Sequence, residues 1–419
     1  MTPNPYRESD PRVPRRERRR IQAELARVVI VGGGVAGIEA ALALQAFAGG
    51  LVEVEIVDPG LRFRIPATAT GRAFGVGSDI DAPLATTVAR TGAVHRRARV
   101  VAVDGGRRLA MLAGGELLTY DALIVAVGAR PEPFLSEALT FTGHADADHV
   151  RELVDGIVAA ARRGARTDLA LVVPPECRWS LAAYELALMT RDHLLATGTE
   201  GTGHITVVTA EPSPLAVFGP QATERVERAL RREGIEVIAN AVVRDWRWGR
   251  LELEGRDPVA ADRVIALPVL RGPAIEGLAA DAHGFLHTLP DGRVAGAPGV
   301  WVVGDAGTFP VKQGGIACQQ ADSAAAEIAR GLGAEVEELP FQPVLRGWIW
   351  DGAGGRFVRA DLPVGGHESP GAESLHPLWW PVAKVAGRFL TPFLEGLPGN
   401  AGLIDLPADV DESWPRPPA

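Results

Sequence analysis

Short apolar runs alternate along this chain with longer stretches in which alanine and leucine recur at helical spacing. The first apolar run covers residues 28–31, and a second, strand-like run follows a helical stretch and covers residues 52–57. The order repeats over residues 168–268, where we expect strands 169–173, 205–209 and 236–243, helices 180–195 and 222–233, and a hairpin over 245–254. Strands that alternate with helices pair in parallel, so the pattern predicts an α/β protein with two similar units.

The turn between the first strand and the first helix is rich in glycine and reads GGGVAG over residues 32–37. Gly32 permits the tight turn, Gly34 lets a diphosphate approach the backbone, and Gly37 lets the helix pack closely on the strand. The helix N-terminus adds free N–H groups and the positive end of the helix dipole. Asp58 ends the next strand, about twenty residues later, where an acid accepts hydrogen bonds from ribose hydroxyls. This order predicts a dinucleotide site over Gly32, Gly34, Val35, Ala36, Gly37 and Asp58; the alternative is a purely structural glycine turn.

A later motif indicates which dinucleotide binds. Residues 300–307 (VWVVGDAG) read as a buried strand that ends in Gly-Asp, and an alanine-rich helix over 316–330 follows. Taken with the first motif, this segment resembles the two-dinucleotide-fold flavoproteins of the pyridine nucleotide–disulfide oxidoreductase superfamily, in particular sulfide:quinone oxidoreductases and type II NADH dehydrogenases. The resemblance covers about residues 26–345. It implies FAD as cofactor and an α/β fold of two Rossmann-like (FAD/NAD(P)-binding, three-layer ββα) domains with a short C-terminal extension.

The same resemblance implies individual cofactor contacts. Asp305 would contact the ribityl side of the flavin, and the backbone of residues 314–316 would face the flavin pyrimidine, where the helix dipole favours the negative charge of a reduced flavin. The loop 62–66, the strand 99–104 and the strand-turn 120–131 are also similar to cofactor-binding segments of the family. The further contacts implied are Pro66, Val100, Ala126, Gly128, Gly304, Gly315 and Ile316.

The corresponding turn of the second unit departs from the nucleotide-binding pattern. It reads VPPECRWS over residues 173–180 and contains no glycine. Pro175 has no N–H to offer, and Glu176 would repel a diphosphate. The departure argues against NAD(P)H binding, although a nicotinamide could still dock differently, with Arg178 neutralising its phosphate.

In the sulfide:quinone branch this turn carries a redox-active cysteine that faces the flavin, and Cys177 falls in the matching turn. A helix N-terminus there would lower the pKa of its thiol. Cys318 lies in the first turns of the helix expected beside the flavin, so the two cysteines could form a relay that passes electrons to the flavin. For each cysteine the alternative is a structural role. Cys318 does not match the distal cysteine of that branch, so a full trisulfide chemistry is not supported.

Three further groups are candidates for chemistry. Lys312, in the loop near the flavin, would stabilise an anionic reduced flavin or a quinone oxygen. Glu185, on the helix after the proline turn, is either a proton-transfer group or an ordinary charged helix residue. The segment HADADH over 144–149 has the residue types of a metal site, but an aspartate there also suits the cap of a helix that starts near Val150, and we expect no metal.

The C-terminal residues 340–419 are rich in tryptophan, glycine and proline. Trp379 and Trp380 stand beside a short apolar stretch that carries Lys384 and Arg388, which is the composition of a segment that lies at a membrane interface. The alternative is that the segment packs over the first domain or forms a homodimer interface.

Composition narrows the class of protein. The formal charge of -9 argues against nucleic-acid binding, and two cysteines among 419 residues exclude a disulfide scaffold. No apolar run reaches the length of a membrane span and no signal peptide is evident, so we expect a cytoplasmic protein, at most peripheral on the inner face of the cell membrane. The expected domains are a flexible tail (1–25), an FAD-binding domain (26–150 and 268–340), a nested NAD(P)-type domain (151–267) and a C-terminal extension (341–419).

These observations favour an FAD-dependent oxidoreductase similar to sulfide:quinone oxidoreductases. It would pass electrons from a small thiol- or sulfide-type reductant to a quinone or similar acceptor. One alternative is an NAD(P)H-dependent flavoprotein reductase of the type II dehydrogenase kind. Another is a flavin redox sensor that does not turn over.

Overall fold

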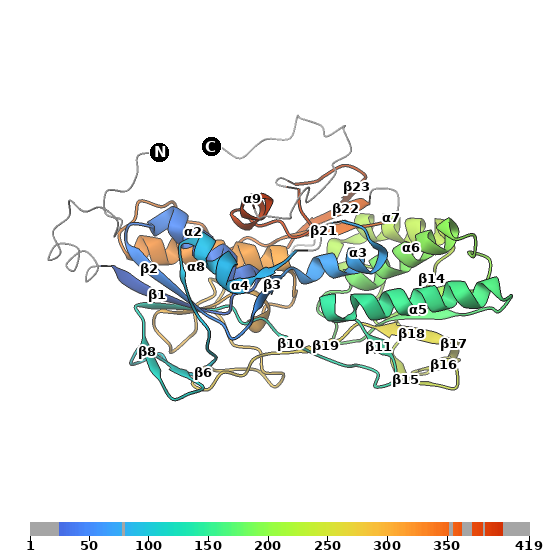
Figure 1. Cartoon of the computed structure of the whole chain (residues 1–419), viewed down its shortest axis with the longest axis horizontal. Coiled ribbons are helices and arrows are strands. Elements are labelled where there is room, and N and C mark those ends of the chain that lie inside the picture. Colours follow the sequence, from blue (N-terminus) through green and yellow to red (C-terminus); the bar gives the residue numbers. More distant parts are fainter. Residues whose placement is uncertain (1–24, 78–79, 352–354, 363–370, 380–381, 397–419) are drawn as a thin grey trace.

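The computed structural model describes residues 25–77, 80–351, 355–362, 371–379 and 382–396 (Figure 1). Its first unit is built on a parallel sheet in the order β20-β9-β1-β2-β5. These strands are β1 (Ala26–Val31), β2 (Val52–Val57), β5 (Val94–Arg96), β9 (Ala122–Val125) and β20 (Val300–Val302). Helices α2 (Val35–Ala48) and α8 (Gly314–Gly331) pack together on this sheet, and α4 (Leu84–Thr91) lies beside α2.

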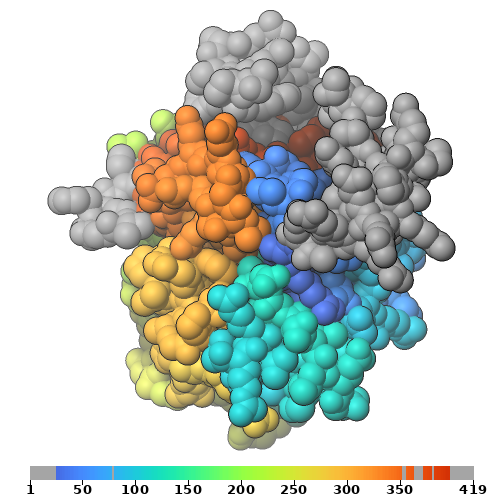
Figure 2. Space-filling model, turned by 90° about the vertical axis from the view of Figure 1, so that its left-hand side faces the viewer, coloured from blue at the N-terminus to red at the C-terminus, as the bar shows by residue number. Residues whose placement is uncertain are grey.

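Alternation along β1 explains why this unit has three layers. Val28 and Ile30 share a core with the residues of α2 and α8. Val29 and Val31 point to the opposite face. There they pack against a small antiparallel sheet of β6 (Val100–Asp104), β7 (Leu109–Leu112) and β8 (Leu117–Thr119). Figure 2 views this end of the molecule, with the β6–β8 region in cyan beside the yellow segment that joins it through a bridge between Ala102 and Glu276. The ββα layering predicted from the sequence is confirmed.

The second unit repeats the design with a parallel sheet in the order β11-β18-β12-β13-β14. Its strands are β11 (Leu139–Thr140), β12 (Leu169–Val173), β13 (Ile205–Thr209), β14 (Glu236–Ile238) and β18 (Arg263–Ala266). Its helices are α5 (His144–Arg162), α6 (Leu181–Ala196) and α7 (Pro220–Arg232), and β15 (Val243–Arg247), β16 (Arg250–Leu253) and β17 (Val259–Ala260) form its small antiparallel sheet. The expected strand over 236–243 is interrupted, because Asn240 adopts a left-handed φ of 50° that a strand cannot contain.

An antiparallel ribbon of β10 (Arg130–Glu132) and β19 (Val269–Arg271) carries the chain between the two units (Figure 1). A second bridge starts in the first unit with β3 (Arg62–Arg64), η1 (Pro66–Thr68), α3 (Ala69–Phe74) and β4 (Asp81–Pro83). Helix α3 of this bridge packs on α5 and α6 of the second unit. The strand β11 pairs with β18 of the second sheet, although it precedes residue 151, where the sequence places the start of the second domain.

The C-terminal residues add a sheet of β21 (Val344–Ile349), β22 (Arg356–Asp361) and β23 (Ala372–Ser374), followed by the short helix α9 (Leu390–Glu395). The sheet packs on α6 and α7 of the second unit, whereas α9 packs on α2 of the first (Figure 1). The extension therefore spans both units. No helix in the described ranges has the length and apolar character that crossing a membrane would require.

Candidate functional site

A cavity of about 470 Å³ lies where the two units meet the C-terminal extension. The N-terminal ends of α2 and α8 both open onto it, through Gly34 and Gly314. The turn 177–179, which precedes α6, and residues of β21 complete its lining. Two helix N-termini that face one cavity supply partial positive charge at two separate points, which suits a long ligand with an anionic group near each.

The glycine turn has the open backbone that a diphosphate requires. A Cβ atom added to Gly34 would meet no atom within 4 Å, so this backbone faces open space at the cavity wall. Gly32 has a φ of +106°, and a Cβ on Gly37 would lie 1.9 Å from the carbonyl oxygen of Gly32. Gly32 is therefore required for the turn and Gly37 for close packing of the helix, as predicted. Asp58 also lines the cavity, and its carboxylate accepts a hydrogen bond of 2.7 Å from the Gly33 N–H.

Asp305 also lines the cavity, and it lies in the short 3-10 helix η3 (Gly304–Ala306), which follows β20. Its carboxylate accepts no hydrogen bond from the described part of the chain. Burial raises its pKa to about 6, against an opposing effect of the Lys312 charge. A buried acid with free acceptor oxygens suits a ligand hydroxyl. Gln313 caps α8 by accepting a hydrogen bond of 2.8 Å from the Ile316 N–H. The glycine cradle, Asp305 and the α8 N-terminus together fit FAD.

The two lysines of the chain both line the cavity. Lys312 donates a hydrogen bond to the Gly307 carbonyl, and its ammonium lies 4.3 Å from the centre of the Phe285 ring. Burial lowers the pKa of Lys312 to about 8. The cation therefore sits beside Asp305 in the wall of the cavity, as the sequence predicts for a group that stabilises negative charge.

The sequence leaves open whether the segment around Lys384 lies at a membrane interface or packs on the protein, and the structure shows Lys384 packed inside the protein. The side chain is buried, and it donates hydrogen bonds to Glu185 of α6 and to the Trp348 carbonyl. Its ammonium lies 4.2 Å from the centre of the Trp350 ring. The physical reason is that the buried Glu185 carboxylate attracts a cation more strongly than an interface would. Trp379 is also buried, while Trp380 lies outside the described residues.

Glu185 is held at the cavity wall by three hydrogen-bond donors. The Thr70 hydroxyl donates to it at 2.6 Å and the Trp350 N–H at 2.9 Å, in addition to Lys384. Its side chain is only 1% exposed. Lys384, Thr70 and Trp350 come from separate parts of the chain, so Glu185 joins these parts at the cavity wall.

The two cysteines do not share the cavity. Cys177 lines it, whereas Cys318 is fully buried in the core between α2 and α8 and is absent from the lining. The expected lowering of the Cys177 pKa is wrong: burial raises it to about 12, although the thiol donates a hydrogen bond to the Trp179 carbonyl at 3.3 Å. Burial also raises the pKa of Cys318 far above its usual range. The structure gives no support to a relay through both thiols.

Most of the residues predicted for the cofactor line the cavity. They are Gly32, Gly34, Val35, Ala36, Asp58, Pro66, Ala126, Gly128, Gly304 and Asp305. Gly37, Gly315 and Ile316 do not line it, and Val100 lies in the core of the β6–β8 layer. Arg64 lies in the loop 62–66 that the sequence predicts, whereas sequence reasoning missed Thr70, Trp179, Arg346, Trp348 and Lys384 as lining residues. Arg346 and Trp348 lie on β21, and no local motif marks that strand.

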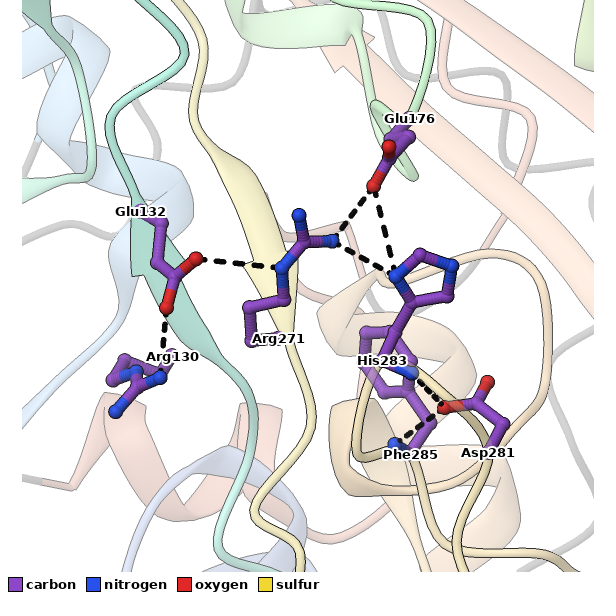
Figure 3. A network of polar contacts seen from close by, with 7 residues as sticks. All are labelled: Arg130, Glu132, Glu176, Arg271, Asp281, His283 and Phe285. Atoms are coloured by element: carbon purple, nitrogen blue, oxygen red, sulfur yellow. Dashed lines mark hydrogen bonds and ion pairs between the residues drawn. The ribbon is translucent and has the colours of Figure 1, made fainter. Parts of the chain in front are cut away.

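In the second unit, the two acids at the place where a dinucleotide fold binds its ligand form hydrogen bonds within the chain. Glu211 follows β13, in the place that Asp58 has after β2. Its carboxylate accepts hydrogen bonds from Tyr184 at 2.6 Å, Ser180 at 2.9 Å and Thr209 at 3.0 Å. In the turn before α6, the Glu176 carboxylate binds Arg271 of β19 at 2.7 Å (Figure 3). Both acids are therefore already engaged within the chain.

The segment 144–149 forms the start of α5. Asp146 lies in the first turn and accepts hydrogen bonds from the N–H and hydroxyl of Thr142 at 2.8 and 2.5 Å, which caps the helix earlier than the expected Val150. Among the described residues no cluster of His, Cys, Asp or Glu has metal-binding geometry.

Comparison with known proteins identifies the family. Residues 26–326 match the family model described as pyridine nucleotide-disulphide oxidoreductase. The chain belongs to this family. A pyridine nucleotide-disulphide oxidoreductase with the cradle described above is a flavin-dependent enzyme, and FAD is its cofactor. The residues that line the cavity would hold the FAD.

Several relatives share part of the sequence or the fold. An NADH dehydrogenase-like protein of Mycobacterium tuberculosis is 26% identical over 301 residues, which cover 67% of this chain and 72% of that protein. A type II NADH:quinone oxidoreductase of the same species is 28% identical over 316 residues, or 67% of this chain and 66% of that protein. The sulfide:quinone oxidoreductase of Aquifex aeolicus superimposes with a TM-score of 0.75 at 18% identity, covering 83% of this chain and 86% of that one.

Proposed function

We propose that this enzyme transfers electrons from a small reductant of the thiol or sulfide type, through FAD, to a quinone-type acceptor. One observation carries the proposal: both acids at the nucleotide position of the second unit are bound within the chain, Glu211 by Tyr184 and Ser180 and Glu176 by Arg271. A dinucleotide would find the ribose acceptor Glu211 already bound, and Pro174 and Pro175 offer no N–H to its diphosphate. A small donor needs neither.

On the donor side, Cys177 is the one thiol among the described residues that lines the cavity. Its raised pKa means that it meets the donor as a neutral thiol. Two donor thiols that form one disulfide release two electrons and two protons. Bound FAD supplies the two-electron carrier between donor and acceptor. The quinone takes up the same two electrons and two protons when it becomes a quinol, so the overall reaction balances.

On the acceptor side, Trp348, Lys384 and Arg346 give the cavity both aromatic surface and positive charge. A planar quinone packs on indole surface, and a cation near its oxygen stabilises the charge that develops during reduction. The Lys384 ammonium can donate a proton from Nζ to the reduced acceptor and regain one from solvent, and the Glu185 carboxylate stabilises its protonated form. Two of the relatives named above, one from sequence and one from structure, are quinone oxidoreductases by name.

The test is the anaerobic absorbance of the bound flavin near 450 nm, which falls when the flavin is reduced. We expect rapid bleaching by sulfide or a small thiol, no bleaching by NADH or NADPH, and recovery of the absorbance on addition of a soluble quinone. Rapid bleaching by NADH or NADPH would overturn the proposal in favour of a type II NADH dehydrogenase-like reductase. No bleaching by any donor would contradict turnover with these donors and favour a redox sensor.

The chain offers a matched pair of variants for the donor side. Cys177→Ser changes a cavity thiol, whereas Cys318→Ser makes the same change in the core. We expect the first variant to slow bleaching by sulfide at least about tenfold and the second to leave it within about twofold. Equal rates in both variants would remove Cys177 from the donor reaction.

A further inference from the structure

Arg271 stands at the centre of a polar network between the two units (Figure 3). Its Nη1 donates a hydrogen bond to Glu176 Oε2 at 2.7 Å and lies 3.0 Å from His283 Nδ1. On its other side, Nε lies 3.3 Å from Glu132 Oε2, and Glu132 also binds Arg130 at 2.7 Å. One guanidinium therefore joins two carboxylates and an imidazole.

The members of this network come from three separate parts of the fold. Arg271 and Glu132 lie on the β10–β19 ribbon, Glu176 lies in the turn before α6, and His283 lies in a loop of the first unit. That loop is held by Asp281, which accepts hydrogen bonds of 2.9 Å from the N–H groups of His283 and Phe285. The backbone that carries the imidazole is thus held by contacts that do not involve Glu176.

Glu176 brings a full negative charge to this place. The hydrogen bond from Arg271, followed by the charges of Arg271, His283 and Arg178, holds the pKa of Glu176 below its usual range. Its side chain is 50% exposed, so solvent and solutes reach the carboxylate. The turn that carries it, between the first strand of a dinucleotide fold and the helix after it, is where such folds receive a diphosphate.

We propose that Arg271 and His283 form an anion-binding site beside the cavity, and that the Glu176 carboxylate is its built-in occupant, which excludes the diphosphate of nicotinamide dinucleotides. This inference rests on the proposed function, in which the donor is small. It assigns the exclusion of the diphosphate at this turn to one side chain: the site keeps the Arg271 guanidinium that would bind a diphosphate, and the Glu176 carboxylate neutralises it and occupies its place. A small donor does not need this site.

The experiment compares the binding of inorganic pyrophosphate and NAD⁺ to FAD-loaded wild-type enzyme and variants by isothermal titration calorimetry. Glu176→Gln removes the charge but keeps the size of the side chain. Glu132→Gln is the matched control, because it removes the same charge from the same guanidinium on the side away from the turn. We expect Glu176→Gln to bind both probes at least about tenfold more tightly than wild type, with the gain weakened by salt, and Glu132→Gln to gain less than about twofold.

A second variant identifies the site that gains affinity. Adding Arg271→Met to Glu176→Gln should abolish the gain for both probes. Wild-type affinity in Glu176→Gln, an equal gain in Glu132→Gln, or a gain that survives the loss of Arg271 would each overturn the inference. The proposed function fails by a different result, namely bleaching of the wild-type flavin by NADH. The flavin absorbance of each variant reports that it is folded and loaded.

Discussion

The ammonium of Lys384 donates a hydrogen bond to the carboxylate of Glu185, which lies 199 residues earlier in the chain. Both side chains are buried, and the same ammonium donates to the Trp348 carbonyl of the C-terminal sheet. A buried charge without a partner is expensive, so this pair fastens the C-terminal extension to the second unit at the wall of the FAD cavity. The extension is therefore part of the site and not an appendage to it.

Lys384→Met should destabilise the protein, because it leaves the buried Glu185 carboxylate without its cation. Breaking a buried ion pair from one side costs about 3–5 kcal/mol, which would lower the urea midpoint of unfolding markedly. The double variant Lys384→Met/Glu185→Gln should recover much of this loss, because the amide no longer needs a cation. A single variant with the wild-type midpoint would contradict the assignment of this pair as a buried charge contact.

The same pair gives a prediction about the two half-reactions. Lys384 touches the side of the cavity assigned to the acceptor, so Glu185→Gln should slow reoxidation of the reduced flavin by a quinone at least about tenfold. Bleaching by the donor should change less than about twofold. Stopped-flow absorbance near 450 nm separates the two steps. A slower reduction by the donor with an unchanged reoxidation by the quinone would show that Glu185 acts in the donor step, and would contradict this prediction.

The pKa of Cys177, raised to about 12 by burial, predicts its reactivity. Only the thiolate reacts with iodoacetamide, so the rate of Cys177 alkylation should rise about tenfold for each pH unit from pH 7 to pH 10 without reaching a plateau. Cys318, which is 1% exposed, should react only after unfolding. Mass spectrometry of the two cysteine peptides distinguishes them. A plateau near pH 8 for Cys177 would indicate an activated thiolate instead.

Replacement of Asp305 should weaken FAD binding without lowering the stability of the folded protein. Its buried carboxylate accepts no hydrogen bond from the described chain, so Asp305→Asn should weaken FAD binding at least about tenfold, the value of a hydrogen bond to a charged group, without lowering the stability of the apoprotein. Because the pKa of Asp305 is raised to about 6, FAD affinity of the wild type should fall as the pH drops through 6, and this dependence should vanish in the variant. Flavin fluorescence during titration measures both effects.

Local sequence predicted the parts of the site that depend on backbone geometry. Gly32, Gly34 and Asp58 could be found because a glycine turn, a helix and a strand-end acid follow each other within one βαβ unit. Cys318 was misjudged through helical phase. Cys318 lies four residues after Gly314 and next to Ala317, both of which line the cavity, so helical spacing alone did not show that Cys318 is buried in the core.

Sequence could not predict contacts that only the tertiary fold creates. Lys384 and Glu185 are far apart in the chain, and the pattern around Lys384 fits an interfacial segment as well as a buried one. The sequence indicates that Glu176 would repel a diphosphate. It does not indicate that Arg271 is the partner of Glu176, because an arginine on a short strand is common. The ribbon that brings Arg271 to the turn depends on the pairing of β10 with β19.

Glu39 of α2 and Asp322 of α8 form a buried pair of two acids, and this pair predicts how the free energy of unfolding depends on pH. Glu39 accepts hydrogen bonds from the N–H groups of Phe389, at 3.0 Å, and Leu390, where α9 begins. Burial, then the charge of Glu39, raises the pKa of Asp322 well above its usual value of 3.8. Above about pH 4, Asp322 keeps its proton in the folded protein but loses it in the unfolded chain. The free energy of unfolding therefore falls as the pH rises above about 4.

Asp322→Asn should relieve this cost, because a neutral amide can donate to Glu39 at every pH. We expect the urea midpoint of the variant to exceed that of the wild type at pH 8, by the equivalent of about 1 kcal/mol or more, and to approach it at pH 5, where the proton shared by the acids is retained in the wild type. Glu327→Gln, on the same helix but bound to Trp301 near the surface, is the control and should show no such pH-dependent gain. A gain that is equal at pH 5 and pH 8 would mean that Asp322 is ionised in the folded protein at both values, and that its interaction with Glu39 does not hold the proton.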